Sequence, residues 1–309
     1  MSFKSGAIFI LFLGTFLLRA EPAPSPDKPI RVLIIDGLSN HDWQQTTRLV
    51  EGILAPTKLF QTSVSTAPAT LNASNYDTWC PDFSRTDVVI VNYNNLGQKI
   101  TWNGTARAAF EKFVKNGGGV FVLHSANNAF ADWPEYNKMI GLGWRSKEFG
   151  DAIQIGPDEK PIRIPSGEGE NTSHHPRQDR LIHLIGNDPI HAGMPRTFLT
   201  PLIEVYRYTR GPAENLTVES WAEDPGSQVR WPIEWVVTYG KGRVYASSFG
   251  HVWRNEADPV DLRDAAFQTI MVRALQWLAQ RPVTFPIPAD FPGPNAVSLR
   301  PTPTLPAGG

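Results

Sequence analysis

The sequence predicts an α/β fold with a doubly wound, mostly parallel sheet flanked by helices. Three short apolar runs, at 31–37, 87–93 and 120–123, have the length of buried strands. Each run ends in polar residues, as strands do where they leave a sheet. Amphipathic segments at 44–54 and 105–116 separate the runs and have helical spacing. Alternation of this kind is typical of a parallel sheet with helices on both faces, and not of a β-sandwich.

Two further features of the first half support the same arrangement. The run at 60–66 alternates poorly between apolar and polar residues, so we expect an edge strand there. The helix at 105–116 is followed by Gly117-Gly118, which is typical of a helix C-cap. The run at 120–123 follows at once and is short for a helix, so we expect a strand that is buried on both faces.

The middle of the chain, 132–230, is less regular, and we expect an inserted irregular region there. It is predicted to contain a short helix that begins at Trp133-Pro134, a hairpin at 153–164, a polar loop at 166–179, and strands at 181–186 and 202–208. The last third is more regular. A β-hairpin turns at Gly240-Lys241-Gly242, and an amphipathic helix is predicted at 264–280.

Composition excludes several classes of partner and site. The 309 residues include 29 Lys and Arg and 30 Asp and Glu, so the chain is nearly neutral. This balance argues against a nucleic-acid partner or an anionic membrane surface. Cys80 is the sole cysteine, which excludes an intramolecular disulfide and a cysteine-based structural zinc site.

The N-terminus predicts an export signal. Lys4 precedes an apolar run, Ala7–Leu18, that is too short to span a bilayer comfortably. We expect a periplasmic or secreted protein without stable membrane association after cleavage, and an uncleaved anchor is the alternative. The predicted parts are a signal peptide at 1–20, a Pro-rich spacer at 21–29, a folded domain at 30–281 and a Pro-rich tail at 282–309.

Three histidines follow apolar runs and are the main site candidates. His41 comes soon after the run that ends at Asp36, His124 follows the run at 120–123, and His251 follows the second arm of the late hairpin. Ligands of open α/β sheets bind beyond the carboxyl ends of the strands, so parallel strands would bring these side chains to one edge. Neutral imidazoles suit divalent metals and also proton transfer. We therefore expect either a metal site, with zinc as the candidate cofactor, or a base–acid set around a substrate.

Other polar and aromatic residues complete the candidate site. Glu148 is a candidate general base, and a solvated loop charge is the alternative. Ser125 is a poor nucleophile candidate, because its flanks lack the Gly-x-Ser-x-Gly elbow. His174 and His175 are adjacent, so only one of them faces a site easily. The residues expected to contact substrate are Asn92, Asn94, Ser125, Trp133 and His174.

Four motifs are informative when they are taken together. They are Gly117-Gly118-Gly119-x-x-x-Leu123-His124-Ser125-Ala126, Gly193-Met194-Pro195, Glu204-x-Tyr206, and Trp235-x-x-x-Tyr239-Gly240-Lys241-Gly242-Arg243-Val244, which continues to Gly250-His251. This combination resembles the ThuA-like (trehalose utilisation) family over nearly the whole chain after the spacer. One local departure is Asp188-Pro189-Ile190, where relatives carry His-Pro-Ile; here His191 comes three residues later.

The resemblance implies a class I glutamine amidotransferase-like, flavodoxin-like fold. It implies that His124 lies at or beside the nucleophile position of those enzymes, and His251 at the position of their catalytic histidine. Because no thiol is present at that point, we expect no glutamine amidotransferase activity. The site would keep its geometry and change its chemistry.

The resemblance also implies a role in disaccharide catabolism, on sugars oxidised to the 3-keto form. A base such as His124 or Glu148 would remove the acidic C2 hydrogen and start an elimination. The partner is then a small carbohydrate. The interpretations that stay open are a hydrolase or lyase, a non-catalytic sugar-binding protein, and a partner-binding scaffold. A homo-oligomer also stays open.

Overall fold

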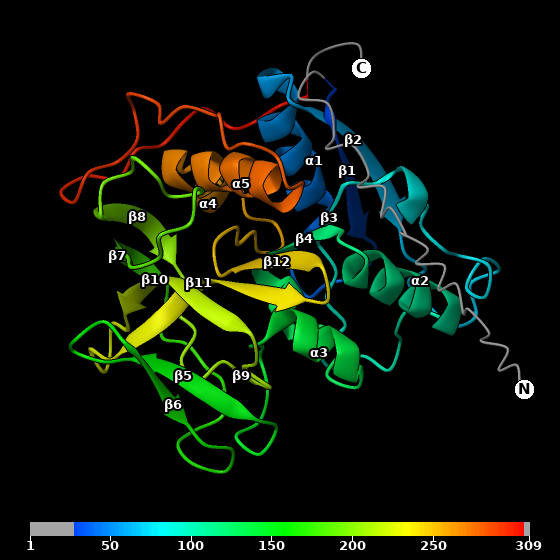
Figure 1. Ribbon diagram of the computed structural model, residues 1–309, viewed down its shortest axis with the longest axis horizontal. Coiled ribbons are helices and arrows are strands. Elements are labelled where there is room, and N and C mark those ends of the chain that lie inside the picture. Colours follow the sequence, from blue (N-terminus) through cyan, green and yellow to red (C-terminus); the bar gives the residue numbers. More distant parts are fainter. Residues whose placement is uncertain (1–27, 306–309) are drawn as a thin grey trace, which may run out of the picture.

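The computed structural model describes residues 28–305 (Figure 1). The predicted signal peptide and most of the predicted spacer lie outside these residues. The strands are β1 (Ile30–Asp36), β2 (Phe60–Thr66), β3 (Val88–Val91), β4 (Gly119–Leu123), β5 (Asp151–Ile155), β6 (Pro161–Ile164), β7 (Gln178–Leu184), β8 (Thr197–Ile203), β9 (Arg210–Gly211), β10 (Leu216–Glu223), β11 (Arg230–Tyr239) and β12 (Gly242–Ser247). They form one 12-stranded sheet in the order β2-β1-β3-β4-β12-β11-β10-β7-β8, and β5 pairs with β11, β6 and β9.

The sheet has a parallel core and an antiparallel extension. β2, β1, β3, β4 and β12 are parallel neighbours. Every residue of β3 and β4 is buried, as expected for strands covered on both faces. Beyond β12 the sheet continues antiparallel through β11, β10, β7 and β8. The predicted α/β class is confirmed, and β2 is the edge strand that its poor alternation predicted.

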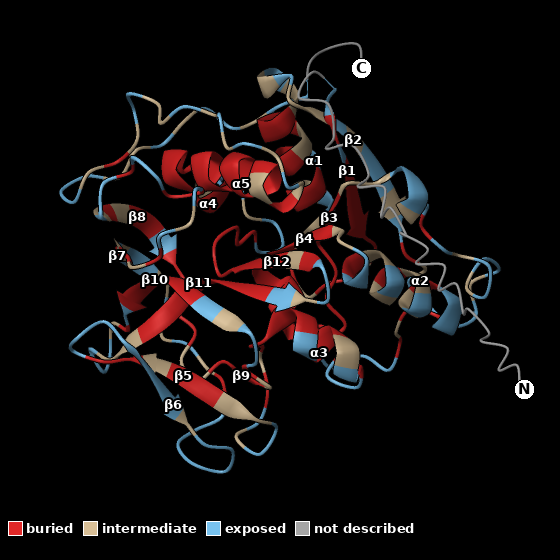
Figure 2. Cartoon of the chain, viewed as in Figure 1, coloured by how far each residue is buried: buried red, intermediate tan, exposed pale blue. Residues whose placement is uncertain are grey.

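Helices cover both faces of the parallel core (Figures 1 and 2). They are α1 (Trp43–Leu54), α2 (Gly104–Lys115), α3 (Pro134–Ile140), α4 (Val260–Arg263) and α5 (Ala265–Leu278), with 3₁₀ turns η1 (Ala55–Thr57), η2 (Phe83–Arg85) and η3 (His124–Asn128). Alternate residues of each strand face opposite layers. In β1, Val32 and Ile34 pack in the core with α1 and α5, whereas Leu33 and Ile35 pack with α2 and α3.

The structure corrects the sequence-based assignment in the middle of the chain. Only the first two residues of the strand predicted at 202–208 lie in a strand, because β8 ends at Ile203, just after Leu202 departs from extended backbone with a φ of 41°. Residues 204–206 are therefore irregular. β10 was not anticipated, since Glu219 and Ser220 interrupt its apolar pattern, and its register shifts at that point. A bulge breaks the alternation of apolar and polar residues, so a strand that contains one is not predicted from that pattern.

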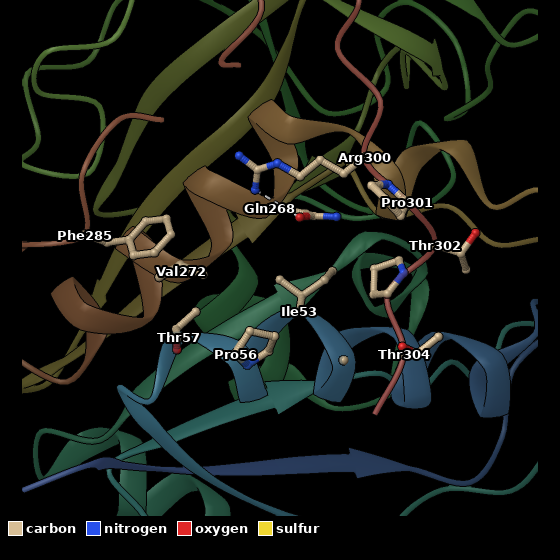
Figure 3. Close-up of a pocket in the computed structure, with 12 residues that line it drawn as sticks. Ile53, Pro56, Thr57, Gln268, Val272, Phe285, Arg300, Pro301, Thr302 and Thr304 are labelled. Carbon is tan, nitrogen blue, oxygen red and sulfur yellow. Dashed lines mark hydrogen bonds between the residues drawn. The ribbon is translucent and has the colours of Figure 1, made fainter. Parts of the chain in front are cut away.

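The C-terminal tail packs on the α1–α5 face. Gly52 of α1 permits this approach, since a Cβ there would lie 2.9 Å from the Thr304 backbone nitrogen. A cavity of about 420 Å³ remains between α1, α5 and the tail, with Ile53, Val272 and Phe285 in its wall (Figure 3). Its lining includes none of the three candidate histidines. No helix within residues 28–305 is long and apolar enough to cross a membrane.

Candidate active site

The three predicted histidines meet at one edge of the parallel core. His41 follows β1, His124 follows β4 and His251 follows β12, and these strands share one direction through β3. The imidazole centroids are 5.0 Å apart for His41 and His124, 4.9 Å for His41 and His251, and 5.0 Å for His124 and His251. All three side chains are buried. The edge geometry of a parallel sheet therefore produces the cluster.

Glu204 completes the cluster from the antiparallel side of the sheet. It lies in the irregular segment after β8, and its carboxylate points between two imidazoles. Glu204 Oε2 is 3.5 Å from His124 Nε2, and Glu204 Oε1 is 3.4 Å from His251 Nε2. One potential ligand atom from each of His41, His124, Glu204 and His251 lies within 4.8 Å of the others. We call these four residues the His₃Glu centre.

Contacts at the far ring nitrogens orient the imidazoles. His124 Nδ1 is 2.7 Å from the carbonyl oxygen of Ser248, and because a carbonyl only accepts, Nδ1 carries the proton. His41 Nδ1 is 2.9 Å from Asn40 Oδ1, which also accepts from Asn94 Nδ2 at 2.7 Å. His251 Nδ1 lies 3.5 Å from a Glu256 carboxylate oxygen without making a hydrogen bond. In His124 this arrangement leaves the Nε2 lone pair directed at the centre.

Burial keeps two of the imidazoles neutral. Desolvation, with a smaller contribution from the neighbouring His251, lowers the pKa of His41 to about 3. Desolvation likewise lowers the pKa of His124 well below its usual value, and His41 adds to the effect. Both rings therefore present lone pairs at neutral pH, which is the form that binds a divalent metal.

An ion-pair network fixes the loop that carries His251. Arg177 Nη1 is 3.0 Å from Glu256 Oε1, and Arg177 Nη2 is 2.8 Å from Asp261 Oδ1. Asp261 Oδ2 in turn accepts a hydrogen bond from the His251 backbone N–H at 3.1 Å. Burial raises the pKa of Glu256, but His251, the Trp253 N–H and Arg177 outweigh burial and lower it to about 2. The carboxylate beside His251 is thus ionised.

The remaining polar residues of the predicted strand ends lie around the centre. Asn92 donates to the Trp43 carbonyl at 2.9 Å and thereby holds the start of α1. Asn94 supports Asn40, which contacts His41. Ser125 Oγ lies 3.4 Å from Ser39 Oγ in the same buried region. These contacts give Asn92 and Asn94 structural partners, and their predicted contact with a substrate stays a prediction.

The other predicted site residues occupy different environments. His174 Nε2 reaches the centre, 3.6 Å from Glu204 Oε1. Trp133 is buried in an aromatic core with Phe130 and donates from Nε1 to Glu111 at 2.6 Å. Glu148 is exposed, and its backbone carbonyl accepts from Ser166. The structure therefore brings His174 to the cluster and places Trp133 and Glu148 outside it.

Sequence reasoning missed Glu204 and Tyr206 as site residues. Tyr206 Oη is 3.3 Å from His124 Nε2, and burial, with Glu204 adding to it, raises its pKa well above the usual value. The phenol therefore stays protonated and can donate. The Glu204-x-Tyr206 motif was the available signal, because it places two polar side chains among apolar neighbours.

A second buried cluster involves other residues: His191, Glu219, Glu234 and Tyr245. His191 Nδ1 is 3.7 Å from Glu219, and His191 Nε2 is 3.6 Å from Glu234. Tyr245 donates to Glu234 at 2.7 Å. Burial lowers the pKa of His191, but the two carboxylates outweigh it and raise the pKa to about 9. We call this the His191 cluster.

Comparison with known proteins assigns the chain to a family. The sequence profile described as "ThuA: Trehalose utilisation" matches residues 31–278. The chain belongs to the ThuA family. This membership indicates a carbohydrate-related function. No curated protein sequence matches this ThuA chain significantly.

Two solved structures are similar to this ThuA protein. A ThuA-like protein of Parabacteroides merdae ATCC 43184 shares 28% sequence identity, with 88% of this chain and 98% of that chain covered and a TM-score of 0.81. A ThuA-like protein of Bacteroides uniformis ATCC 8492 shares 17% identity, with 84% and 95% covered and a TM-score of 0.54. The second likeness shows the fold alone.

Proposed function

We propose that this protein is a hydrolase or lyase of 3-keto disaccharides that acts at the His₃Glu centre. The observation that carries the proposal is the convergence of four potential ligand atoms within 4.8 Å. Membership of a family described by trehalose utilisation supports a carbohydrate substrate. We propose no glutamine amidotransferase activity, because the chain's one cysteine, Cys80, is exposed and lies outside the centre.

The donor set fits a divalent metal such as zinc. Imidazole nitrogen and carboxylate oxygen are common zinc ligands, and four is its usual number of protein ligands in a closed site. The lowered pKa values of His41 and His124 keep both rings in the binding form. His41, His124, His251 and Glu204 would hold the ion. A bound zinc, which can expand to five ligands, would supply Lewis-acid stabilisation of negative charge on a substrate oxygen.

Proton transfer falls to side chains beside the four ligands. A 3-keto group acidifies the C2 hydrogen, and a base that removes this proton lets the C–H electron pair form a C1–C2 double bond. The C1–O bond to the leaving sugar then breaks, and the leaving oxygen takes a proton. In a hydrolase, water subsequently adds across the C1–C2 double bond. The reaction needs no oxidant or reductant, only an acid and a base.

His174 and Tyr206 are the groups that we assign to these transfers. His174 Nδ1 is 2.8 Å from the His175 carbonyl oxygen, so it donates there, which leaves Nε2 directed toward Glu204. Tyr206 is protonated and directed at His124 Nε2, where it can donate to a substrate oxygen. This assignment replaces His124 as the base, because its Nε2 belongs to the ligand set.

Turnover of a 3-keto disaccharide tests the proposal. Zinc-loaded protein should release free monosaccharide from 3-keto-trehalose, and His124→Ala should abolish release by dismantling the centre. His174→Gln should lower kcat while zinc content stays stoichiometric. The control is His183→Gln, because His183 stacks on Trp221 and is outside the centre. A zinc-loaded wild-type protein without turnover on any 3-keto disaccharide would overturn the enzyme assignment, and retained sugar binding would then favour the non-catalytic alternative.

We also propose that the protein is exported. Support comes from Lys4 and the apolar run at 7–18 in the sequence. N-terminal sequencing of protein isolated from its host should give a chain that starts near Glu21. A mature chain that retains Met1 and the apolar run would contradict export by cleavage.

A further inference from the structure

An exposed tryptophan stands directly beside the His₃Glu centre. The Trp253 ring makes an edge contact with His41 at a centroid distance of 4.9 Å and lies 12° from parallel to His251 at 6.0 Å. Trp253 is 48% exposed. All ten tryptophans lie within residues 28–305, and the other nine are buried or half-buried. A large apolar side chain left open beside a buried polar centre points to a ligand contact.

The backbone around Trp253 is held in place although the ring is open. The Trp253 N–H donates to Glu256 Oε2 at 2.7 Å, and the Glu256 N–H donates to the Trp253 carbonyl at 3.2 Å. The next residue, Arg254, donates from Nη2 to the Ser39 carbonyl at 3.0 Å. Because these bonds fix the turn, the indole can offer a face at little further cost in conformational entropy.

A second tryptophan borders the centre next to different residues. The Trp144 ring lies 5.3 Å from Tyr206 and 5.8 Å from His174, and it is half-buried. Trp253 contacts His41 and His251, whereas Trp144 contacts the two groups assigned to proton transfer. One tryptophan therefore lies next to His41 and His251, and the other lies next to Tyr206 and His174.

We propose that Trp253 is the stacking platform for one hexopyranose ring of the substrate, and that it determines preference for disaccharides over monosaccharides; this inference rests on the proposed function. A pyranose ring has C–H bonds on its faces and hydroxyls around its edge. An indole face can bury the C–H surface without stranding a hydroxyl, and the hydroxyls remain free for polar neighbours. His41, which Trp253 contacts, is hydrogen-bonded to Asn40 and Ser39, and Ser39 Oγ lies 3.4 Å from Ser125 Oγ.

The two tryptophans suit a substrate with two sugar rings. The ring that reacts must reach Tyr206 and His174, which Trp144 borders. The ring on Trp253 is then the one that does not react. Removing the Trp253 face should weaken binding of a disaccharide and leave a 3-keto monosaccharide unaffected, because a single ring has no partner on that platform.

The test compares Trp253→Ala, Trp253→Phe and Trp253→Leu with Ile162→Ala, an exposed apolar residue on β6 that serves as the control. With 3-keto-trehalose, Trp253→Ala should raise KM by about tenfold and change kcat by less than about twofold, as expected for loss of one aromatic stack. The KM of Trp253→Phe should lie between the values of the wild type and of Trp253→Ala. The KM of Trp253→Leu should resemble that of Trp253→Ala, because leucine keeps apolar area but has no flat ring. An unchanged KM in Trp253→Ala, or a fall in its kcat alone, would overturn the proposal that Trp253 stacks on a sugar ring.

Calorimetric titration with trehalose separates this inference from the proposed function. If the wild-type protein has no turnover but binds trehalose, weaker binding by Trp253→Ala than by Ile162→Ala supports the platform while the enzyme assignment fails. If the wild-type protein turns over 3-keto-trehalose and all Trp253 variants match it, the enzyme assignment stands and the platform fails. If the wild-type protein binds no sugar, the platform fails as well.

Discussion

Glu204→Gln is the sharpest probe of the His₃Glu centre. The substitution keeps the size and shape of the side chain and removes its charge. The Glu204 carboxylate oxygens lie 3.4 Å from His251 Nε2 and 3.5 Å from His124 Nε2, so an amide at this point keeps the packing of the centre. What it loses is the single anionic ligand. The variant should therefore fold like the wild type and bind zinc more weakly.

The expected effect follows from binding linkage. Zinc at 100 times its dissociation constant stabilises the wild type by about 2.7 kcal/mol. For a domain of this size, about 2–4 °C of melting temperature corresponds to 1 kcal/mol, so zinc should raise the melting temperature by roughly 5–11 °C. Even changes to groups behind the ligands cost about 10–100-fold in metal affinity. At the 100-fold limit the same zinc concentration stabilises Glu204→Gln by only about 0.4 kcal/mol, or roughly 1–2 °C.

The assay is a thermal melt of chelator-treated protein across a zinc titration, with each protein's metal-free melt as its own baseline. Glu170→Gln is the matched control, because Glu170 pairs with Arg207 at 3.5 Å, its side chain is 59% exposed, and it lies outside the centre. The control should keep the full zinc-induced shift. Two results would contradict zinc binding through Glu204: a full zinc-induced shift of the melting temperature in Glu204→Gln, or no shift in the wild type.

Three further predictions concern charge and stability. His41 has a folded pKa of about 3 and titrates near 6.5 when unfolded, so the unfolded chain binds the extra proton. Metal-free protein should lose about 1 kcal/mol from this group between pH 6.5 and 5.5; urea unfolding should show a shallower loss in His41→Asn, and equal losses would contradict it. For His191 the pH dependence of stability is opposite, because the two glutamates of its cluster raise its pKa to about 9. Its stabilisation of about 3 kcal/mol is complete below pH 6.5 and is lost as pH rises through 9, a loss that His191→Gln should not show in urea unfolding. Arg177→Met leaves the buried carboxylate of Asp261 without its ion-pair partner and should lower the free energy of unfolding by about 3 kcal/mol. The control is Arg180→Met, because Arg180 is half-buried and hydrogen-bonds the neutral Gln178, so its loss should cost much less. Equal stabilities of the two variants would refute the role of the Arg177–Asp261 pair.

The parallel core could be predicted because its residues obey simple periodicities. β1, β3 and β4 are short apolar runs between helical segments, and the strand direction then brings the residues that follow them to one edge. That geometry alone led from separate sequence positions to His41, His124 and His251. The structure brings these imidazoles within about 5 Å of one another, centroid to centroid. This part of the site could be predicted because each of the three histidines follows a predicted strand.

The fourth member of the centre could not be found in this way. Glu204 reaches the histidines from an irregular segment after β8, and β8 belongs to the antiparallel extension. Such a position depends on tertiary packing and has no period. Tryptophans were ambiguous for a related reason. Trp133 and Trp253 are equally apolar in sequence, yet one fills the core and the other is 48% exposed beside the site.

His124 connects the fold to the chemistry through its backbone. Its φ of 43° is in the left-handed region, which glycine or asparagine adopts more readily than histidine. Such a conformation costs on the order of 1–3 kcal/mol and persists only where the surroundings enforce it. Two features hold His124 in this conformation: Nδ1 donates to the Ser248 carbonyl at 2.7 Å, and the side chain is buried. Glycine would adopt this conformation at the end of β4 without strain. A histidine at this strained turn makes sense if Nε2 must be held toward Glu204, so at His124 the proposed metal binding would be coupled to folding.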